Sequence, residues 1–512
     1  GSGGLILSEN PGEIEYDDLE QCAVWRDKNN GADCLFFYAP GVVKWNADKE
    51  DGIFTHQIND YSSKGFFFLT DNVGSAKNTP LLTAETAPAT HTVTSANAYQ
   101  LYENDLENVL QYGSGRKWYG EKFRNSTVKN IDFTLDDIDA TAPVKITASG
   151  IARSYNKSQM KVAVNQTEVG SLNFSAVNTG SQTSEYANEK SGLFSSTVTG
   201  NPVRITLKFF TDNIGGSIDD NALAWLDYLE INYKRNLKFG GKSFLFSNLS
   251  SIGEGNITAF TIENAVSGVR VFDVTDNFNV TEIPVEITGG KGVIKRSSQN
   301  FSEYLAFNPN ATFSEPELVG SVSNQNLHAI SVPEFVIITH PLFLNAATRL
   351  AEFHRNFDGM DVEVVNSEDI YNEFSSGERN ATGIRNFIKM MYDKSPALKY
   401  VLLLGDGSFD NRGLRNITKN FIPTYQSENS LVPVESFVTD DYFALLDADE
   451  SVYNGSLNIG IGRIPASTAY EAEVVVNKIE SYFLPEALGS WRNVVCFIGD
   501  DEDGNEHLSN TE

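Results

Sequence analysis

The chain has 512 residues, of which 40% are hydrophobic and 11% aromatic, enough apolar material for several packed cores. A formal net charge of −29 argues against a protein that binds DNA or RNA through the phosphate backbone. No apolar run of about 18 residues occurs, so no membrane-spanning helix is expected. Three cysteines exclude a disulfide scaffold, although Cys22 and Cys34 could pair across a short loop in an exported protein.

Short strands separated by turn residues are predicted over the first 333 residues. Residues 1–120 form the first β-rich region, with aromatic segments "CLFFYAPG" (34–41) and "KGFFFLTD" (64–71). The first helical period in the chain appears only at "YENDLENVLQYG" (102–113). Large aromatic side chains are mostly buried in proteins, so we expect Trp45, Trp118 and Trp225 to pack in cores.

Strict alternation of apolar and polar residues marks the next region, 121–236, as a β-sandwich. Its predicted strands are "PVKITASGIA" (143–152), "MKVAVNQTEVG" (160–170), "PVRITLKFF" (202–210) and a core strand at 222–235. Residues 237–333 continue in the same style as a further β-rich domain. Nothing in the first 330 residues clusters His, Cys or carboxylates at a catalytic spacing.

The pattern changes to alternating strands and helices in the region 334–487, which predicts an α/β subdomain with a mainly parallel sheet. The predicted strands are 334–339, 362–365, 400–405 and 457–465. A helical stripe follows the first strand and ends before Gly359, a typical C-cap residue. Thr468 and Glu471 form a capping box before a helix at 470–483.

A further strand is predicted at "NVVCFIGDD" (493–501), so residues 488–512 would begin a second α/β subdomain. Since a parallel sheet should not end just after it is entered, we expect the chain to be an N-terminal fragment of a longer protein. Cys496 lies inside the apolar run of that strand, which predicts an inert buried thiol. We therefore reject Cys496 and His507 as a nucleophile and base.

Ligands of open α/β sheets bind at the carboxyl ends of the strands. The ionisable candidates there are His340, Asp406, Asp410, Asp440 and Asp441. The loop "GDGSFDN" (405–411) lacks the lysine of a phosphate loop and the closing glutamate of a calcium loop. The alternative is that Asp406 holds a turn by accepting backbone N–H groups. "TDDY" (439–442) could line a pocket for a basic side chain or form an exposed acidic turn.

The ordered motifs of the C-terminal part resemble the gingipain-type (C25) cysteine peptidases, which have a caspase-like fold. They are "YVLLLGDGSFDN" (400–411), "IPTYQ" (422–426), "TDDYFALLD" (439–447), "IGIGRIP" (459–465) and "NVVCFIGDD" (493–501). Three further segments match the PorU-like signal peptidase, or sortase, group of the type IX secretion system more specifically. These are "AWLDYLEINYKR" (224–235), "EDIYNEFSSG" (368–377) and "GIRNFIKMMYD" (383–393).

This resemblance implies an exported protein at the outer-membrane surface of Bacteroidota cells. Such proteins cleave C-terminal sorting domains from cargo and can transfer the cargo to anionic lipopolysaccharide. An outer-membrane barrel shuttle protein holds them at the membrane. The chemistry is a Cys–His acyl transfer that requires no cofactor. The family's catalytic histidine and cysteine would follow residue 512, so no catalytic residue is expected within this chain, and the chain alone should be inactive.

The resemblance also assigns roles at the predicted crevice. Asp440 matches the gingipain aspartate that lines the pocket for the residue before the scissile bond, and Asp441 adjoins it. His340 and Asp406 are expected at the crevice rim. Gingipain-like domains also bind structural calcium, for which the acidic loops are candidates, without a defined set of ligands. The alternative function is a non-enzymatic surface protein whose β-rich part binds a glycan or another partner, with the α/β part as a degenerate scaffold.

Overall fold

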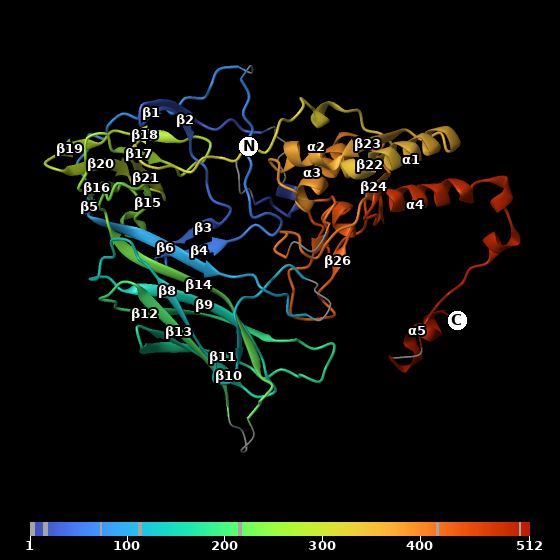
Figure 1. Ribbon diagram of the computed structural model, residues 1–512, viewed down its shortest axis with the longest axis horizontal. Coiled ribbons are helices and arrows are strands. Elements are labelled where there is room, and N and C mark those ends of the chain that lie inside the picture. The colour runs from blue at the N-terminus through green and yellow to red at the C-terminus, as the bar shows by residue number, and fades with distance from the viewer. Residues whose placement is uncertain are drawn as a thin grey trace.

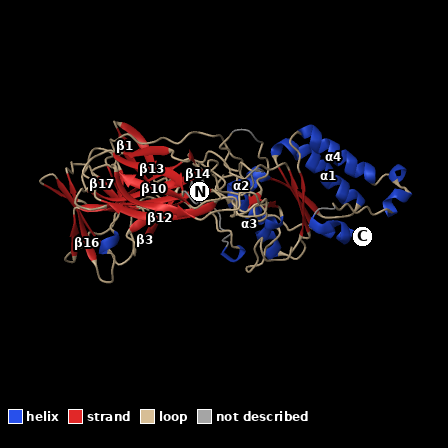
Figure 2. Cartoon of the chain, turned by 90° about the horizontal axis from the view of Figure 1, so that it is seen from below, coloured by secondary structure: helices blue, strands red, loops and turns tan. Residues whose placement is uncertain are grey.

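The computed structural model describes residues 6–13, 19–71, 74–110, 115–212, 218–415, 419–500 and 503–511. Figure 1 shows a β-rich part, coloured blue to yellow-green, beside an α/β part in orange and red. Seen from below, strands fill one end of the molecule and helices gather at the other (Figure 2). The predicted fold class, β-rich N-terminal sheets followed by a parallel-sheet α/β region, is therefore confirmed.

The elements of the first 120 residues are distributed over several sheets. They are η1 (Pro11–Glu13), β1 (Val24–Asn29), β2 (Ala32–Phe37), β3 (Lys44–Asp48), β4 (Ile53–Gln57), β5 (His91–Val93) and β6 (Ser95–Glu103). β1 and β2 form a hairpin, as do β3 and β4. β5 pairs with β16 further along the chain, and β6 joins the sandwich. The predicted helical period at 102–113 is wrong in its described part, because Tyr102 and Glu103 end β6 and no helix follows.

Two antiparallel sheets form the sandwich, in the orders β11-β10-β13-β8 and β12-β9-β14-β6, with β7 also paired to β14. Its strands are β7 (Lys122–Arg124), β8 (Val128–Phe133), β9 (Val144–Arg153), β10 (Ser158–Val164), β11 (Thr167–Phe174), β12 (Asn188–Ser196), β13 (Val203–Thr211) and β14 (Leu223–Asn236). The predicted strand 160–170 is a hairpin instead, because Asn165 and Gln166 adopt positive φ and turn the chain. β14 is the predicted core strand and contributes Leu229 and Ile231, both fully buried.

The third region packs two further sheets around a core that contains Phe246, Phe260 and Val271. The sheets run β15-β21-β17-β18 and β19-β20-β16-β5. Their strands are β15 (Phe244–Phe246), β16 (Ile257–Glu263), β17 (Arg270–Asp273), β18 (Thr281–Ile283), β19 (Glu286–Thr288), β20 (Lys291–Ser297) and β21 (Tyr304–Phe307), with η2 (Leu249–Ser251) after β15 and η3 (Leu327–Ala329) in the connection to the α/β part.

The α/β part is built on a parallel sheet in the order β23-β22-β24-β27. Its strands are β22 (Phe335–Thr339), β23 (Val362–Asn366), β24 (Tyr400–Leu404) and β27 (Gly460–Ile464), and β25 (Tyr425–Gln426) pairs with β26 (Val438–Thr439) beside it. The helices are η4 (Pro341–Phe343), α1 (Leu344–Phe357), α2 (Ser367–Phe374), α3 (Ala381–Lys394), η5 (Asp441–Phe443) and α4 (Ala469–Tyr482). Side chains of α1 and α4 share one core with the sheet, and those of α2, α3 and η5 share another, so both faces are covered.

The helix ends follow the predicted capping rules. Gly359 has a φ of 67° just beyond α1, a conformation that glycine adopts without a steric penalty. Thr468 accepts a hydrogen bond from the backbone N–H of Glu471, and the Glu471 carboxylate accepts one from the N–H of Ser467. These contacts satisfy N–H groups that have no partner within α4.

Two predictions about the cysteines are wrong. Cys22 and Cys34 form no disulfide with each other, because Cys34 lies opposite Asp27 in the hairpin and Cys22 is five residues before Asp27, displaced along the chain by roughly 15 Å. Cys496 is exposed, since no strand forms in the described part of the predicted strand, 493–500, where Val494 and Ile498 keep 71% and 90% of their surface accessible. An apolar run becomes a buried strand only where a neighbouring strand or helix covers it, and the described residues provide none. The chain continues through η6 (Pro485–Ala487), η7 (Ser490–Asn493), η8 (Asp503–Asn505) and α5 (Glu506–Thr511).

Candidate functional site

Loops from each half of the parallel sheet meet at its carboxyl edge. The chain turns one way from β22 to β23 and the other way to β24 and β27, so the topological switch point lies between β22 and β24. We call the loops at this edge the carboxyl-edge rim: His340 after β22, Gly405–Asp410 after β24, Asp440–Asp441 after β26, and Ala466–Ser467 after β27. Within the described chain, this is where an open α/β sheet of this order would bind a ligand.

His340 lies at the start of η4, on the β22 side of the switch point. Its Nδ1 accepts a hydrogen bond from the backbone N–H of Leu342. The ring packs on Phe421, with the ring centroids 4.9 Å apart. Burial lowers the pKa of His340, and the charge of Arg379 lowers it further. The imidazole is therefore a neutral group that caps its own turn, and it is half-buried rather than fully solvent-exposed as a lone loop histidine would be.

Asp406 holds the turn after β24, as one of the two interpretations of its loop sequence predicts. Its carboxylate accepts from the backbone N–H of Gly407 and the hydroxyl of Ser467, which ties the β24 loop to the β27 loop. Asp410 is buried, and its two oxygens accept the N–H groups of Leu414 and Arg415. Both carboxylates therefore fix the backbone conformation of the loop after β24.

Arg463 on β27 is the rim residue that the sequence reasoning missed. Its guanidinium forms a bidentate pair with Asp440, at 2.8 Å from Nε to Oδ2 and 2.7 Å from the second terminal nitrogen to Oδ1. The substrate role of Asp440 stays a prediction, but its carboxylate already has a fixed counter-ion. An arginine inside "IGIGRIP" alternates with apolar residues, and that pattern gave no indication of the partner.

Structural calcium in the acidic loops stays a prediction. Both oxygens of Asp410 and both of Asp406 already accept hydrogen bonds from the protein. No group of three or more His, Cys, Asp and Glu in the described residues is arranged to hold a metal. Asp441 is exposed at the first position of η5.

The β-rich part covers the "GDGSFDN" loop. Trp118, which is 5% exposed, stacks on Phe409 with centroids 5.8 Å apart and an interplanar angle of 6°. Arg412 pairs with Asp105 at 2.7 Å, with both side chains nearly buried. The backbone N–H of Lys117 donates to the hydroxyl of Ser430. The loop after β24 is thus also an interface between the two halves of the molecule, which sequence patterns within either half could not reveal.

A buried charged cluster lies elsewhere, on the outer face of β14. His56 on β4 contacts Glu230 through Nδ1 at 2.7 Å and Glu103 through Nε2 at 3.1 Å. Burial alone would lower the pKa of His56, but hydrogen bonds and the charges of both glutamates raise it to about 9. The three residues are far apart in the sequence, so they form no local motif. Their effect is to fasten the β3–β4 hairpin to the sandwich.

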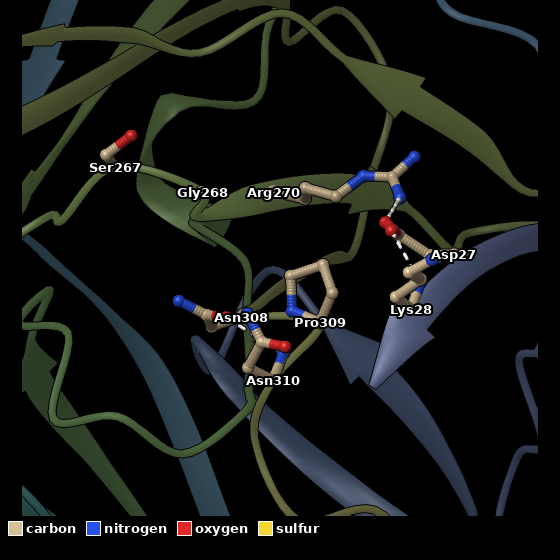
Figure 3. Close-up of a pocket in the computed structure, with 8 residues that line it drawn as sticks. All are labelled: Asp27, Lys28, Ser267, Gly268, Arg270, Asn308, Pro309 and Asn310. Carbon is tan, nitrogen blue, oxygen red and sulfur yellow. Dashed lines mark hydrogen bonds and ion pairs between the residues drawn. The ribbon is translucent and has the colours of Figure 1, made fainter. Parts of the chain in front are cut away.

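A polar pocket of about 360 Å³ lies in the β-rich part (Figure 3). Arg270 pairs with Asp27 at its edge, as the dashed line in the figure shows. Arg270 also pairs with Glu282. The pocket is lined by Asp27, Lys28, Ser267, Gly268, Arg270, Asn308, Pro309 and Asn310. No aromatic ring is among these residues, so a ligand in this pocket would be held by polar contacts rather than by stacking.

The fold and rim together define a class: a multidomain protein in which β-rich domains precede an open, doubly wound α/β domain with a loop-built carboxyl edge. Residues 328–512 match the profile of peptidase family C25. This segment, the α/β part of the chain, is therefore a gingipain-like C25 peptidase segment. The described part of the chain contains no helix that is both long and apolar enough to cross a membrane.

The latent, dimeric PorU of Porphyromonas gingivalis is similar over nearly the whole chain. Its crystal structure superimposes with a TM-score of 0.83 at 27% sequence identity, covering 99% of this chain and 49% of PorU. An uncharacterized protein of Archaeoglobus fulgidus is 27% identical over 168 residues, which are 31% of this chain and 37% of that protein. The chain therefore spans about half the length of PorU and less of the archaeal relative.

Proposed function

We propose that this chain is the N-terminal part of a cell-surface cysteine endopeptidase and transpeptidase of the PorU type. The longer protein removes C-terminal sorting domains from type IX secretion cargo and transfers the cargo to anionic lipopolysaccharide. The observation that carries this proposal is the likeness to PorU, which includes the β-rich domains as well as the C25 segment. A match confined to the α/β fold would support only a peptidase of unspecified role.

The reaction is an acyl transfer. A cysteine thiolate from the part of the protein after residue 512 attacks the scissile carbonyl, the sorting domain leaves as an amine that takes a proton from the histidine, and a thioester remains. Water or an amine of the lipopolysaccharide then attacks the thioester and restores the thiol. In this chain the rim supplies one wall of the substrate site, and the nucleophile comes from the later part of the protein. An outer-membrane barrel shuttle protein is the proposed partner at the membrane.

Mass spectrometry of cargo termini in cells tests the proposal. Cells with the full-length protein should release cargo without its sorting domain and joined to lipopolysaccharide. Replacement of the downstream cysteine by alanine should leave the sorting domain attached. Residues 1–512 alone should restore neither product. Cleavage that persists in the alanine variant would refute the proposal.

A second candidate is a surface protein that binds ligands without catalysis, and the polar pocket of the β-rich part is the observation that favours it. Glycan-array binding by the chain that is lost in Arg270→Met would support this function. Normal processing of cargo by the full-length protein carrying the same substitution would assign the essential role to the peptidase instead.

A further inference from the structure

Arg463 uses every hydrogen-bond donor of its guanidinium. Nε and one terminal nitrogen donate to the two oxygens of Asp440. The other terminal nitrogen donates to the carbonyls of Gly405, at 2.9 Å, and Ile422, at 2.8 Å. A fifth bond reaches the carbonyl of Pro423 at 3.3 Å. An arginine has five N–H groups, so none is left for a substrate.

The acceptors come from separate loops of the rim. Gly405 follows β24, Ile422 and Pro423 precede β25, and Asp440 follows β26. The Arg463 side chain is 10% exposed, and that of Asp440 is 24% exposed. The planar guanidinium therefore sets the spacing of these loops as well as the orientation of Asp440.

The pairing changes what Asp440 presents to a ligand. Arg463 already balances the charge of this carboxylate, so a basic side chain would gain its full attraction only by displacing Arg463, which would leave a mostly buried guanidinium without its counter-ion. The neighbouring Asp441 is exposed, and the described structure records no ion pair for its carboxylate. The two adjacent acids therefore differ. The charge of Asp440 is balanced by Arg463, and the Asp441 carboxylate is solvated.

We propose that Arg463 is a positioning and specificity-determining residue of the peptidase. It holds Asp440 as its own counter-ion. This wall of the substrate site therefore accepts an uncharged rather than a basic side chain at the substrate residue before the scissile bond. The inference rests on the proposed function for its substrate, but the charge pairing that it describes can be tested without catalysis.

The test measures binding of agmatine, a small guanidinium probe, to residues 1–512 by NMR titration. The wild-type chain should show no saturable binding below millimolar concentrations. Arg463→Met should free Asp440 and tighten agmatine binding at least tenfold, and Arg463→Lys, which keeps the charge, should gain much less. Adding Asp440→Asn to Arg463→Met should abolish the gain, whereas adding Asp441→Asn, the matched control, should retain it.

A second variant, which removes the acid of the pair instead of the arginine, tests the same pairing if Arg463→Met does not fold. Asp440→Asn leaves Arg463 without its counter-ion, so N-acetylglycine, a small carboxylate probe, should bind this variant at least tenfold more tightly than the wild type. Wild-type binding of agmatine as tight as that of Arg463→Met, a gain that survives Asp440→Asn, or no gain of carboxylate binding in Asp440→Asn would each overturn the proposal.

Activity of the full-length protein separates this inference from the proposed function. Arg463→Met should raise the ratio of kcat/KM for cleavage after Arg or Lys to kcat/KM for cleavage after Ala at least tenfold. A merely structural defect would lower kcat/KM for all substrates alike. Absence of any peptidase activity in the wild type would refute the proposed function and leave the binding result standing. Peptidase activity with unchanged selectivity in the variant would refute the inference alone.

Discussion

Raising the pH through about 9 should weaken the attachment of the β3–β4 hairpin to the sandwich. The pKa of His56 is raised from an ordinary 6.5 to about 9 by Glu103 and Glu230, against the opposing effect of burial. A group whose pKa is raised in the folded state stabilises it fully below pH 6.5, and the contribution disappears as the pH rises through the folded-state value. The difference between the two pKa values corresponds to roughly 3 kcal/mol of the free energy of unfolding. The imidazole is only 7% exposed, so little solvent screening reduces this figure.

Urea unfolding followed by tryptophan fluorescence measures the effect, because the ring of Trp45 lies 6.0 Å from that of His56. The His56 cluster should contribute about 3 kcal/mol to the fall of the free energy of unfolding between pH 6 and pH 10 in the wild type. His56→Gln should already be less stable by about 3 kcal/mol at pH 7, because two buried carboxylates lose their cation. The difference in stability between the wild type and His56→Gln should then shrink by about 3 kcal/mol over the same range.

The control is His91→Gln, on β5 and outside the cluster, which should keep the wild-type pH dependence. Titration of tyrosine, lysine and cysteine is common to all these variants, so it cancels in the comparison. A parallel pH dependence of wild type and His56→Gln would refute the reasoning, since the imidazolium would then contribute nothing specific.

Three further predictions concern the rim and α4. Trp118→Ala should destabilise the chain by about 3–5 kcal/mol and speed limited proteolysis near Phe409, because the stack between the two halves is lost; unchanged cleavage would contradict this. Asp410→Ala should cost about 2 kcal/mol in urea unfolding, because the N–H groups of Leu414 and Arg415 lose a charged acceptor, whereas Asp410→Asn, which keeps one oxygen, should cost less. Thr468→Ala should cost about 1 kcal/mol and Thr468→Ser almost none; equal losses would exclude the hydroxyl cap of α4.

The strand and helix pattern was largely predictable because it depends on neighbours in the sequence. Alternation located β9, β13 and β14, and continuous apolar runs located the buried strands of the parallel sheet. The turn role of Asp406 also followed from local chemistry, since its first partner is the next residue. The same local reasoning failed at 493–501, where an apolar run meets no strand or helix to cover it and Cys496 is exposed.

The family and the two-part architecture thus follow from local patterns and ordered motifs, which are written into short segments of the chain. Only the tertiary structure decides which charges neutralise one another. Asp440 and Arg463 are 23 residues apart, and His56 and Glu230 are 174 residues apart. Ion pairs of this kind form wherever folding removes two opposite charges from water together, and no periodicity or motif records the partner. The character of Asp440, neutralised acid or free carboxylate, was therefore set by the packing of β27 against the loops around it.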